Sequence, residues 1–100
     1  MSVLVITKVA GDTTAFRQAL AQRGGEFAKF AESAKAAGAI HHRFGIGDGY
    51  VVVVDEWESP SAFESFMSDP ELQRFIASAG AAAGPPDVMI TEAVRSPDEF

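Results

Sequence analysis

The chain has 100 residues, of which 47% are hydrophobic and 22% are charged, which fits one globular domain, residues 1–100, with a core of its own. It has no cysteine, which excludes disulfide bonds, thiolate metal sites and a cysteine nucleophile. Its formal net charge is −6, whereas proteins that bind nucleic acid or an anionic membrane carry a positively charged surface. We therefore expect neither partner. The apolar run in the N-terminal stretch MSVLVITK is too short for a signal peptide or a membrane span. We therefore expect a cytoplasmic location.

The first expected strand is residues 2–9, SVLVITKV, which is apolar at both odd and even positions. Because successive side chains of a strand point to opposite faces, this pattern predicts a central strand that is covered on both faces. Asp12 follows and is expected to cap a helix by accepting a hydrogen bond from a first-turn amide.

The second element is an amphipathic helix from about residue 13 to residue 37, ending at Gly38. Apolar residues recur at helical spacing in this range: Phe16, Leu20, Phe27, Phe30 or Ala31, and Ala34. Gly24 and Gly25 interrupt the pattern without shifting its phase, so we expect one long helix with a weak or kinked middle. Two separate helices are the alternative.

A hairpin follows. Residues 39–46 alternate, with His42 among the apolar residues of one face, which predicts a half-exposed edge strand. The Gly47-Asp48-Gly49 turn connects it to the run Tyr50–Val54, which is β-branched or aromatic and apolar on both faces. We interpret this run as the second central strand, ending near Trp57.

The remaining elements are two short helices and a strand. Ser59 and Pro60 predict the start of the first helix, and Ser68 with Glu71 has the spacing of a capping box for the second. A loop over residues 80–86 leads to a strand over 88–94 of mixed polarity, and residues 95–100 are expected to form an exposed extension.

This element order predicts an α+β, ferredoxin-like βαββαβ fold with an antiparallel sheet of order 4-1-3-2 and the helices on one face. The two central strands have no water-facing side, and the helices suffice for one face only. We therefore expect a homodimer in which two sheets face each other and form a dimeric α+β barrel.

The stretch VVVVDEWESPSAFESFMSDPELQRFI, Val51 to Ile76, resembles the second half of the dimeric α+β barrel superfamily, in its antibiotic biosynthesis monooxygenase-like branch. The resemblance implies a cofactor-independent monooxygenase-like enzyme that acts on a small aromatic or polyketide-like substrate, with Trp57 in the pocket. The oxygenases of this branch resemble one another in an asparagine where this chain has Val53. Because the chain contains no asparagine, the pattern of the haem-degrading relatives is absent and we do not expect haem degradation.

His42 is the candidate catalytic base, because imidazole titrates near neutral pH and this one shares a face with apolar residues. The alternative is a hydrogen-bonded histidine of the core or of the dimer interface. Trp57, the second candidate catalytic residue, lines the pocket or simply anchors packing. The expected pocket-lining residues, which are equally compatible with an ordinary core, are Phe27, Phe44, Phe63 and Phe66.

No metal or organic cofactor is expected. Adjacent strand residues point to opposite faces, so His41 and His42 cannot easily share an ion. Asp55, Glu56 and Glu58 are interpreted as a solvated strand end. Besides the oxygenase, two hypotheses stay open: a non-catalytic homodimer that binds a small ligand or a partner protein, and an enzyme of another kind, such as an isomerase.

Overall fold

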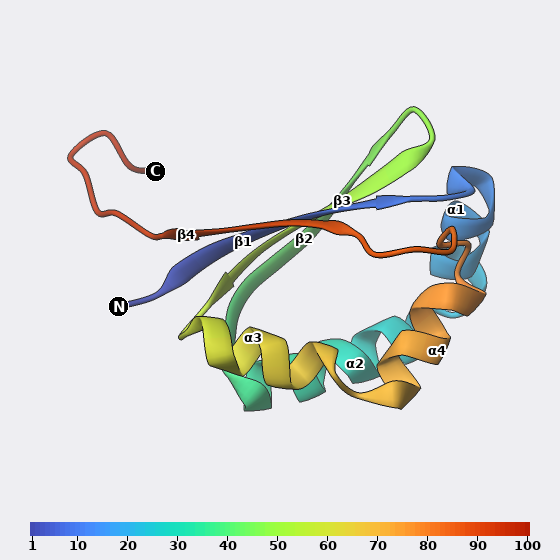
Figure 1. Ribbon diagram of the computed structural model, residues 1–100, viewed down its shortest axis with the longest axis horizontal. Coiled ribbons are helices and arrows are strands. Elements are labelled where there is room, and N and C mark those ends of the chain that lie inside the picture. The colour runs from blue at the N-terminus through green and yellow to red at the C-terminus, as the bar shows by residue number, and fades with distance from the viewer.

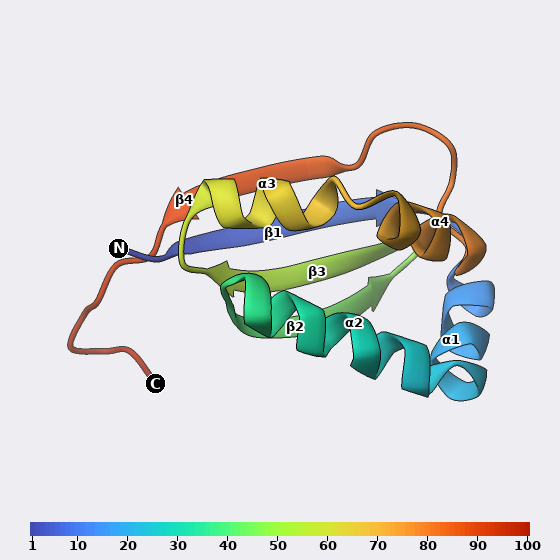
Figure 2. The same cartoon turned by 90° about the horizontal axis from the view of Figure 1, so that it is seen from below.

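The computed structural model describes residues 1–100, which form one four-stranded antiparallel sheet and a layer of helices on one of its faces (Figures 1 and 2). The strands are β1 (Val3–Ala10), β2 (Ala39–Gly47), β3 (Tyr50–Trp57) and β4 (Asp87–Glu92). The helices are α1 (Thr13–Gln22), α2 (Gly24–Ala37), α3 (Pro60–Met67) and α4 (Pro70–Ser78). The sheet order β2-β3-β1-β4 confirms the predicted order and the ferredoxin-like architecture.

The register of the strands decides which side chains face the helices. In β1 and β3, Val5 is paired with Asp55, and in β3 and β2, Asp55 is paired with His42. Directly paired residues of antiparallel strands share a face, so these three side chains form one row across the sheet. The neighbouring row runs from Val88 through Thr7 and Val53 to Phe44.

The single long helix predicted over residues 13–37 is wrong. The backbone of Arg23, at φ −122° and ψ 28°, leaves the helical conformation and separates α1 from α2, which run in different directions (Figure 2). Two consecutive glycines follow, where helix propensity is lowest, so a corner here has a small local cost. The corner lets Phe16 of α1 pack edge-on against Phe27 of α2, with ring centroids 5.9 Å apart.

The helix starts follow local chemistry. Asp12 accepts hydrogen bonds from the amides of Thr14 and Ala15, and Ser59 accepts one from the amide of Ala62, as expected of N-caps. The predicted capping box of Ser68 and Glu71 is wrong, because Asp69 caps α4 by accepting from the Glu71 amide at 2.9 Å. Pro70 occupies the first turn of α4, and the residue just before it takes the cap.

The edge strand β2 departs from strict alternation at its start. A bulge lies between Ala39 and His41, so Ile40 has no partner in the register and is 46% exposed. The predicted inner face therefore holds for His42, Phe44 and Ile46, while Ile40 lies outside the register and still lines the space between the sheet and the helices. The Asp48-Gly49 turn then closes the predicted hairpin with β3.

The face of the sheet opposite the helices is uncovered in the single chain (Figure 1). Apolar side chains on it are partly open, with Leu4 38%, Val54 47% and Met89 58% exposed. Residues 95–100 extend away from the sheet as predicted. None of the helices has the length and apolar character needed to cross a membrane.

The core is divided into two clusters at opposite ends of the helix layer. One contains Phe16 and Val51 near α1, and the other contains Val5, Trp57 and Phe63 near α3. Only 12 of the 100 residues are buried, which is few for a chain with 47% hydrophobic residues. The side chains between the two clusters surround open space instead of filling it.

Candidate functional site

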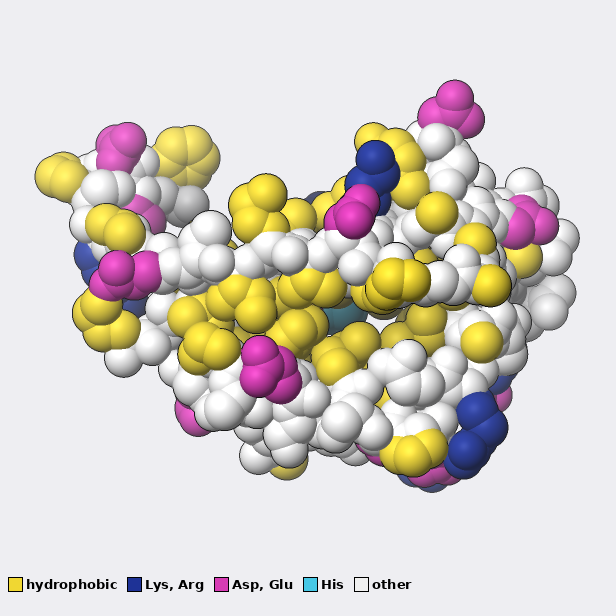
Figure 3. Space-filling view, viewed as in Figure 1, with side chains coloured by type: hydrophobic (Ala, Val, Ile, Leu, Met, Phe, Trp, Pro, Cys, Tyr) yellow, Lys and Arg dark blue, Asp and Glu magenta, His cyan; other side chains and the backbone are white.

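A cavity of about 940 Å³ lies between the sheet and the helices. Most of its lining residues are hydrophobic, and they come from both core clusters and from the centres of β1, β2 and β3. Figure 3 shows the opening as a hollow ringed by hydrophobic side chains, with histidine surface visible deep inside it. This volume is in the range of pockets that hold small organic molecules.

Asp55 is the central polar residue of the cavity wall. It belongs to the middle strand β3 and is only 8% exposed. Its Oδ1 atom lies 2.7 Å from His42 Nδ1, and its Oδ2 atom accepts a hydrogen bond from Trp57 Nε1 at 3.1 Å. Both carboxylate oxygens are therefore paired, as a buried carboxylate requires.

The pairing orients the His42 ring. As a carboxylate, Asp55 can only accept, so Nδ1 of His42 carries a proton and donates it, which leaves a lone pair on Nε2 of the neutral ring. The ring also packs edge-on against Phe44, with centroids 4.7 Å apart. The His42 side chain remains 42% exposed and lines the cavity. This arrangement presents an oriented basic nitrogen to a mostly apolar space.

Trp57 anchors the other end of this hydrogen-bonded group. Its residue is 2% exposed, and its ring packs on Phe63 and Phe66 with centroids 5.7 and 5.4 Å away. Trp57 is expected either to line a pocket or to anchor packing. In the structure it packs in a core cluster and also lines the cavity. Through its indole N–H it holds the carboxylate that holds His42.

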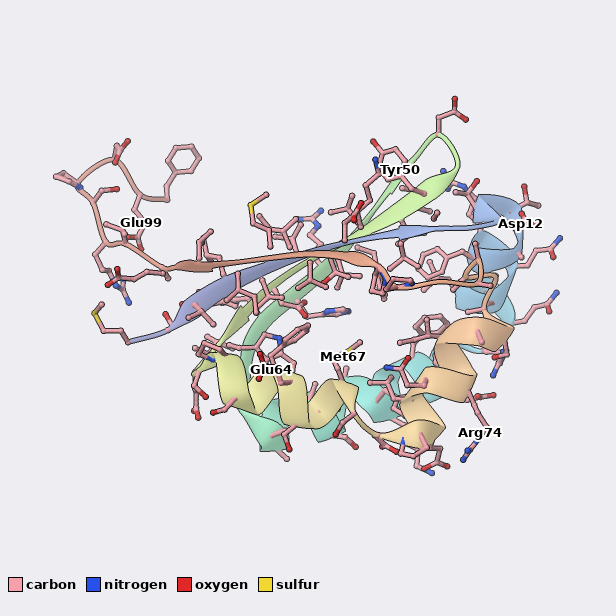
Figure 4. The ribbon with its side chains drawn as sticks, viewed as in Figure 1. Asp12, Tyr50, Glu64, Met67, Arg74 and Glu99 are labelled. Carbon is pink, nitrogen blue, oxygen red and sulfur yellow. The ribbon has the colours of Figure 1, made fainter.

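The four predicted wall phenylalanines, Phe27, Phe44, Phe63 and Phe66, all line the cavity. The rings of Phe27 and Phe44 meet edge-on with their centroids 6.0 Å apart. The Phe27 ring also contacts the ring of Phe75 in α4, with centroids 4.8 Å apart. These contacts connect α2, α4 and the sheet around the space. Away from it, Arg74 of α4 points outward, and Tyr50 lies on the outer side of the sheet (Figure 4).

The interpretation of Asp55 as part of a solvated strand end is wrong. Strand alternation was the signal that could have found it, because Asp55 has the same parity as Val51, Val53 and Trp57. A carboxylate on an apolar face needs a partner, and the hairpin supplies His42 as one. No group of three or more histidine, aspartate or glutamate side chains is arranged to hold a metal ion.

Two side chains with a shifted pKa, Arg23 and Glu26, lie at the corner between α1 and α2, outside the cavity. The guanidinium of Arg23 donates to both carboxylate oxygens of Glu26, at 3.3 and 2.9 Å. These hydrogen bonds lower the pKa of Glu26 below its ordinary value and raise the pKa of Arg23. Arg23 also donates to Ser78 at 2.8 Å and lies over the Phe75 ring, so it joins this corner to α4.

No protein-family model and no curated protein matches the sequence. Solved structures do match over nearly the whole chain. SnoaB from Streptomyces nogalater, a cofactor-independent oxygenase, has a TM-score of 0.66 at 15% identity, with 98% of each chain covered. The monooxygenase of ActVA-Orf6 from Streptomyces coelicolor, in complex with nanaomycin D, has a TM-score of 0.62 at 22% identity, with 95% of this chain and 88% of that chain covered.

A third match, Rv0793 from Mycobacterium tuberculosis, has a TM-score of 0.63 at 18% identity and covers 98% of this chain and 100% of its own. A protein described as an antibiotic biosynthesis monooxygenase also matches, with a TM-score of 0.63 and 15% identity over 93% of this chain and 99% of that chain. At these identities the likeness concerns the backbone and carries no residue role across. The chain has the α+β fold of the antibiotic biosynthesis monooxygenases, as the resemblance of Val51 to Ile76 implied.

Proposed function

We propose that the chain is a cofactor-independent monooxygenase that acts on a small aromatic or polyketide-like substrate inside the cavity. The observation that carries the proposal is the His42–Asp55–Trp57 group in the wall of an otherwise mostly apolar space. A cavity lined by hydrophobic residues alone would favour passive binding. An oriented imidazole adds a group that can remove a proton from a bound ligand.

The chemistry begins at Nε2 of His42. This atom takes a proton from an acidic C–H or O–H of the substrate, and Asp55 stabilises the imidazolium that forms. The phenylalanine wall favours flat aromatic rings and holds them near the base. The same fold in a cofactor-independent oxygenase and in a monooxygenase that binds nanaomycin D supports this substrate class.

The oxidant is dioxygen. An electron-rich aromatic anion transfers electrons to O2 and forms a C–O bond to one oxygen atom. Cleavage of the O–O bond converts a ring CH2 to a carbonyl group, and the second oxygen atom leaves as water. The four electrons lost by the carbon reduce the O2, so the step balances without a metal or an organic cofactor.

We further propose that the working form is a cytoplasmic homodimer through the uncovered sheet faces. Leu4, Val54 and Met89 lie on this face and are each more than a third exposed. A sheet with both faces apolar needs a second covering layer, and another copy of the sheet supplies one of matching shape.

The second candidate function is a non-catalytic homodimer that binds a small ligand or a partner protein. The predominance of hydrophobic residues in the cavity wall favours it, because binding alone needs no base. The two functions differ in oxygen uptake. A passive binder is stabilised by its ligand, by about 2.7 kcal/mol at a hundred times the dissociation constant, and consumes no oxygen.

The test compares His42→Ala with Arg74→Ala, since Arg74 is an exposed residue of α4 that points away from the cavity (Figure 4). With anthrone as the probe, oxygen uptake and incorporation of heavy oxygen from labelled O2 are measured. We expect a loss in kcat of about 100-fold or more for His42→Ala and little change for Arg74→Ala. Equal turnover by the two variants would remove His42 from the mechanism. Saturable binding of the probe by the wild type without oxygen uptake would favour the second function.

A further inference from the structure

Thr7 is a buried polar residue on the cavity side of β1. Its residue is 5% exposed and lines the cavity. Its register partners are Val53 on β3 and Val88 on β4, so it lies in the row next to that of Asp55 and His42. The hydroxyl is therefore surrounded by an apolar part of the wall.

The Thr7 hydroxyl has no partner within the protein. Every fully buried side-chain nitrogen or oxygen has a hydrogen-bond partner, whereas Thr7 Oγ1 takes part in none of the side-chain hydrogen bonds. The small exposure that this oxygen retains must be toward the cavity that Thr7 lines. A hydroxyl in an apolar wall costs free energy unless it finds a partner, which a bound molecule can supply.

Strand formation does not explain the hydroxyl. Val3, Val5 and Val9 occupy the other inward positions of β1, and valine has nearly the same shape as threonine. A fourth valine would serve the strand and the packing equally well. The feature that distinguishes Thr7 from these neighbours is its ability to donate and accept a hydrogen bond.

We propose that Thr7 is a positioning residue that hydrogen-bonds an oxygen atom of the ligand while His42 faces the acidic position of the same ligand. This inference deepens the proposed function and rests on it. Thr7 and His42 are two strands and two residues apart, which corresponds to roughly 12 Å between their Cα atoms. A ring system lying over Val53 would reach both side chains.

This arrangement favours one ligand class: flat aromatic molecules in which a carbonyl or hydroxyl oxygen lies across a ring from an acidic C–H or O–H. Removal of the proton by His42 sends negative charge through the conjugated ring to that oxygen. A hydroxyl donor already placed there binds the charged form more tightly than the neutral form. Thr7 would thus contribute to both orientation and proton removal.

The test compares two probes that share one tricyclic frame: anthrone, which has the carbonyl oxygen, and 9,10-dihydroanthracene, which lacks it. Binding is measured without oxygen, so that turnover does not interfere, for the wild type, Thr7→Val and Thr7→Ser. We expect Thr7→Val to weaken anthrone binding about fivefold to tenfold and dihydroanthracene binding less than twofold. Thr7→Ser, which keeps the hydroxyl, should restore most of the preference. Thr91→Val, on the outer face, is the matched control.

The outcomes separate this inference from the proposed function. Equal effects of Thr7→Val on the two probes, or no effect, would overturn the Thr7 contact even if the wild type oxidises anthrone in air. A selective loss of anthrone binding together with no oxygen uptake by the wild type would support the contact and overturn the oxygenase. Failure of the wild type to bind either probe would overturn both. A thermal unfolding midpoint of Thr7→Val no lower than that of the wild type shows that the variant is folded.

Discussion

His42 Nδ1 lies 2.7 Å from Asp55 Oδ1, although the two residues are 13 positions apart and belong to different strands. The hairpin brings them together, because their positions are direct partners in the β2–β3 register. The bond gives the imidazole a defined orientation and a defined tautomer. If His42 is the base, its activity depends on a residue that need not touch the substrate.

The first prediction concerns Asp55→Asn. An amide in place of the carboxylate can donate to Nδ1, which moves the ring proton to Nε2 and removes the lone pair needed for proton abstraction. We expect kcat for anthrone oxidation to fall about 100-fold, with little change in the affinity for the ligand. Nitrogen NMR of the imidazole should show the changed tautomer. The control is Asp48→Asn in the exposed hairpin turn, and an equal loss in both variants would contradict the assigned role.

The second prediction concerns Trp57→Phe. The substitution removes the hydrogen bond to Asp55 Oδ2 and leaves a small void beside Phe63 and Phe66. We expect the free energy of unfolding to fall by about 2 kcal/mol, as measured by denaturant titration. Tyr50→Phe, at the opposite end of β3, should change it by less than about 0.5 kcal/mol. A Trp57→Phe protein as stable as the wild type would show that the indole hydrogen bond adds nothing to stability.

The third prediction concerns the pH dependence set by Glu26. Its pKa is lowered in the folded chain, chiefly by the hydrogen bond from Arg23, so its stabilising effect is present above the ordinary value of 4.5. The effect is lost as the pH falls below this value through the folded-state pKa. We therefore expect Glu26→Gln to unfold at a lower temperature than the wild type near pH 6, and the difference to shrink in acid. The control is Glu32→Gln, which removes an exposed i,i+3 ion pair with Lys35. If the unfolding temperatures of the wild type and of Glu26→Gln differ by the same amount at every pH, Glu26 does not set the pH dependence.

The fourth prediction concerns the uncovered sheet face. Val54 is 47% exposed on this face, and an aspartate there would bring a charge into any contact between two sheets. We expect Val54→Asp to sediment as a monomer at micromolar concentrations at which the wild type is a dimer. Ala36→Asp, on an exposed position of α2, should leave the dimer intact. A wild type that sediments as a monomer at these concentrations would refute the dimer itself.

Much of the fold can be predicted from residues close together in the chain. The apolar runs of β1 and β3, the caps at Asp12 and Ser59 and the glycine turn of the hairpin are local signals, and each is confirmed. The errors arose where two local signals competed. At Gly24 the helical phase continued although the backbone turned, and at Asp69 a proline decided between two possible caps.

The candidate site was only partly predictable. His42, Trp57 and the phenylalanines were recognised from their residue type and their strand or helix face, and all of them line the cavity. Asp55 has acidic neighbours, Glu56 and Glu58, which indicate a solvated strand end, whereas its strand parity indicates an inward side chain. In the sequence Thr7 has the properties of an ordinary strand former, and nothing local distinguishes it from the neighbouring valines.

The sequence by itself determined the four strands, the two helices after β3 and the two apolar faces of the central strands, because these depend on side-chain period and on caps within a few residues. Only the tertiary structure decided that Asp55 meets His42, that Thr7 has no partner and that the core divides around a cavity. These facts depend on strand register and on the distance between helices and sheet, which are set by contacts between residues far apart in the chain. A hollow and a filled interior can share one hydrophobic pattern, since the pattern specifies which side chains point inward and does not specify how closely they meet.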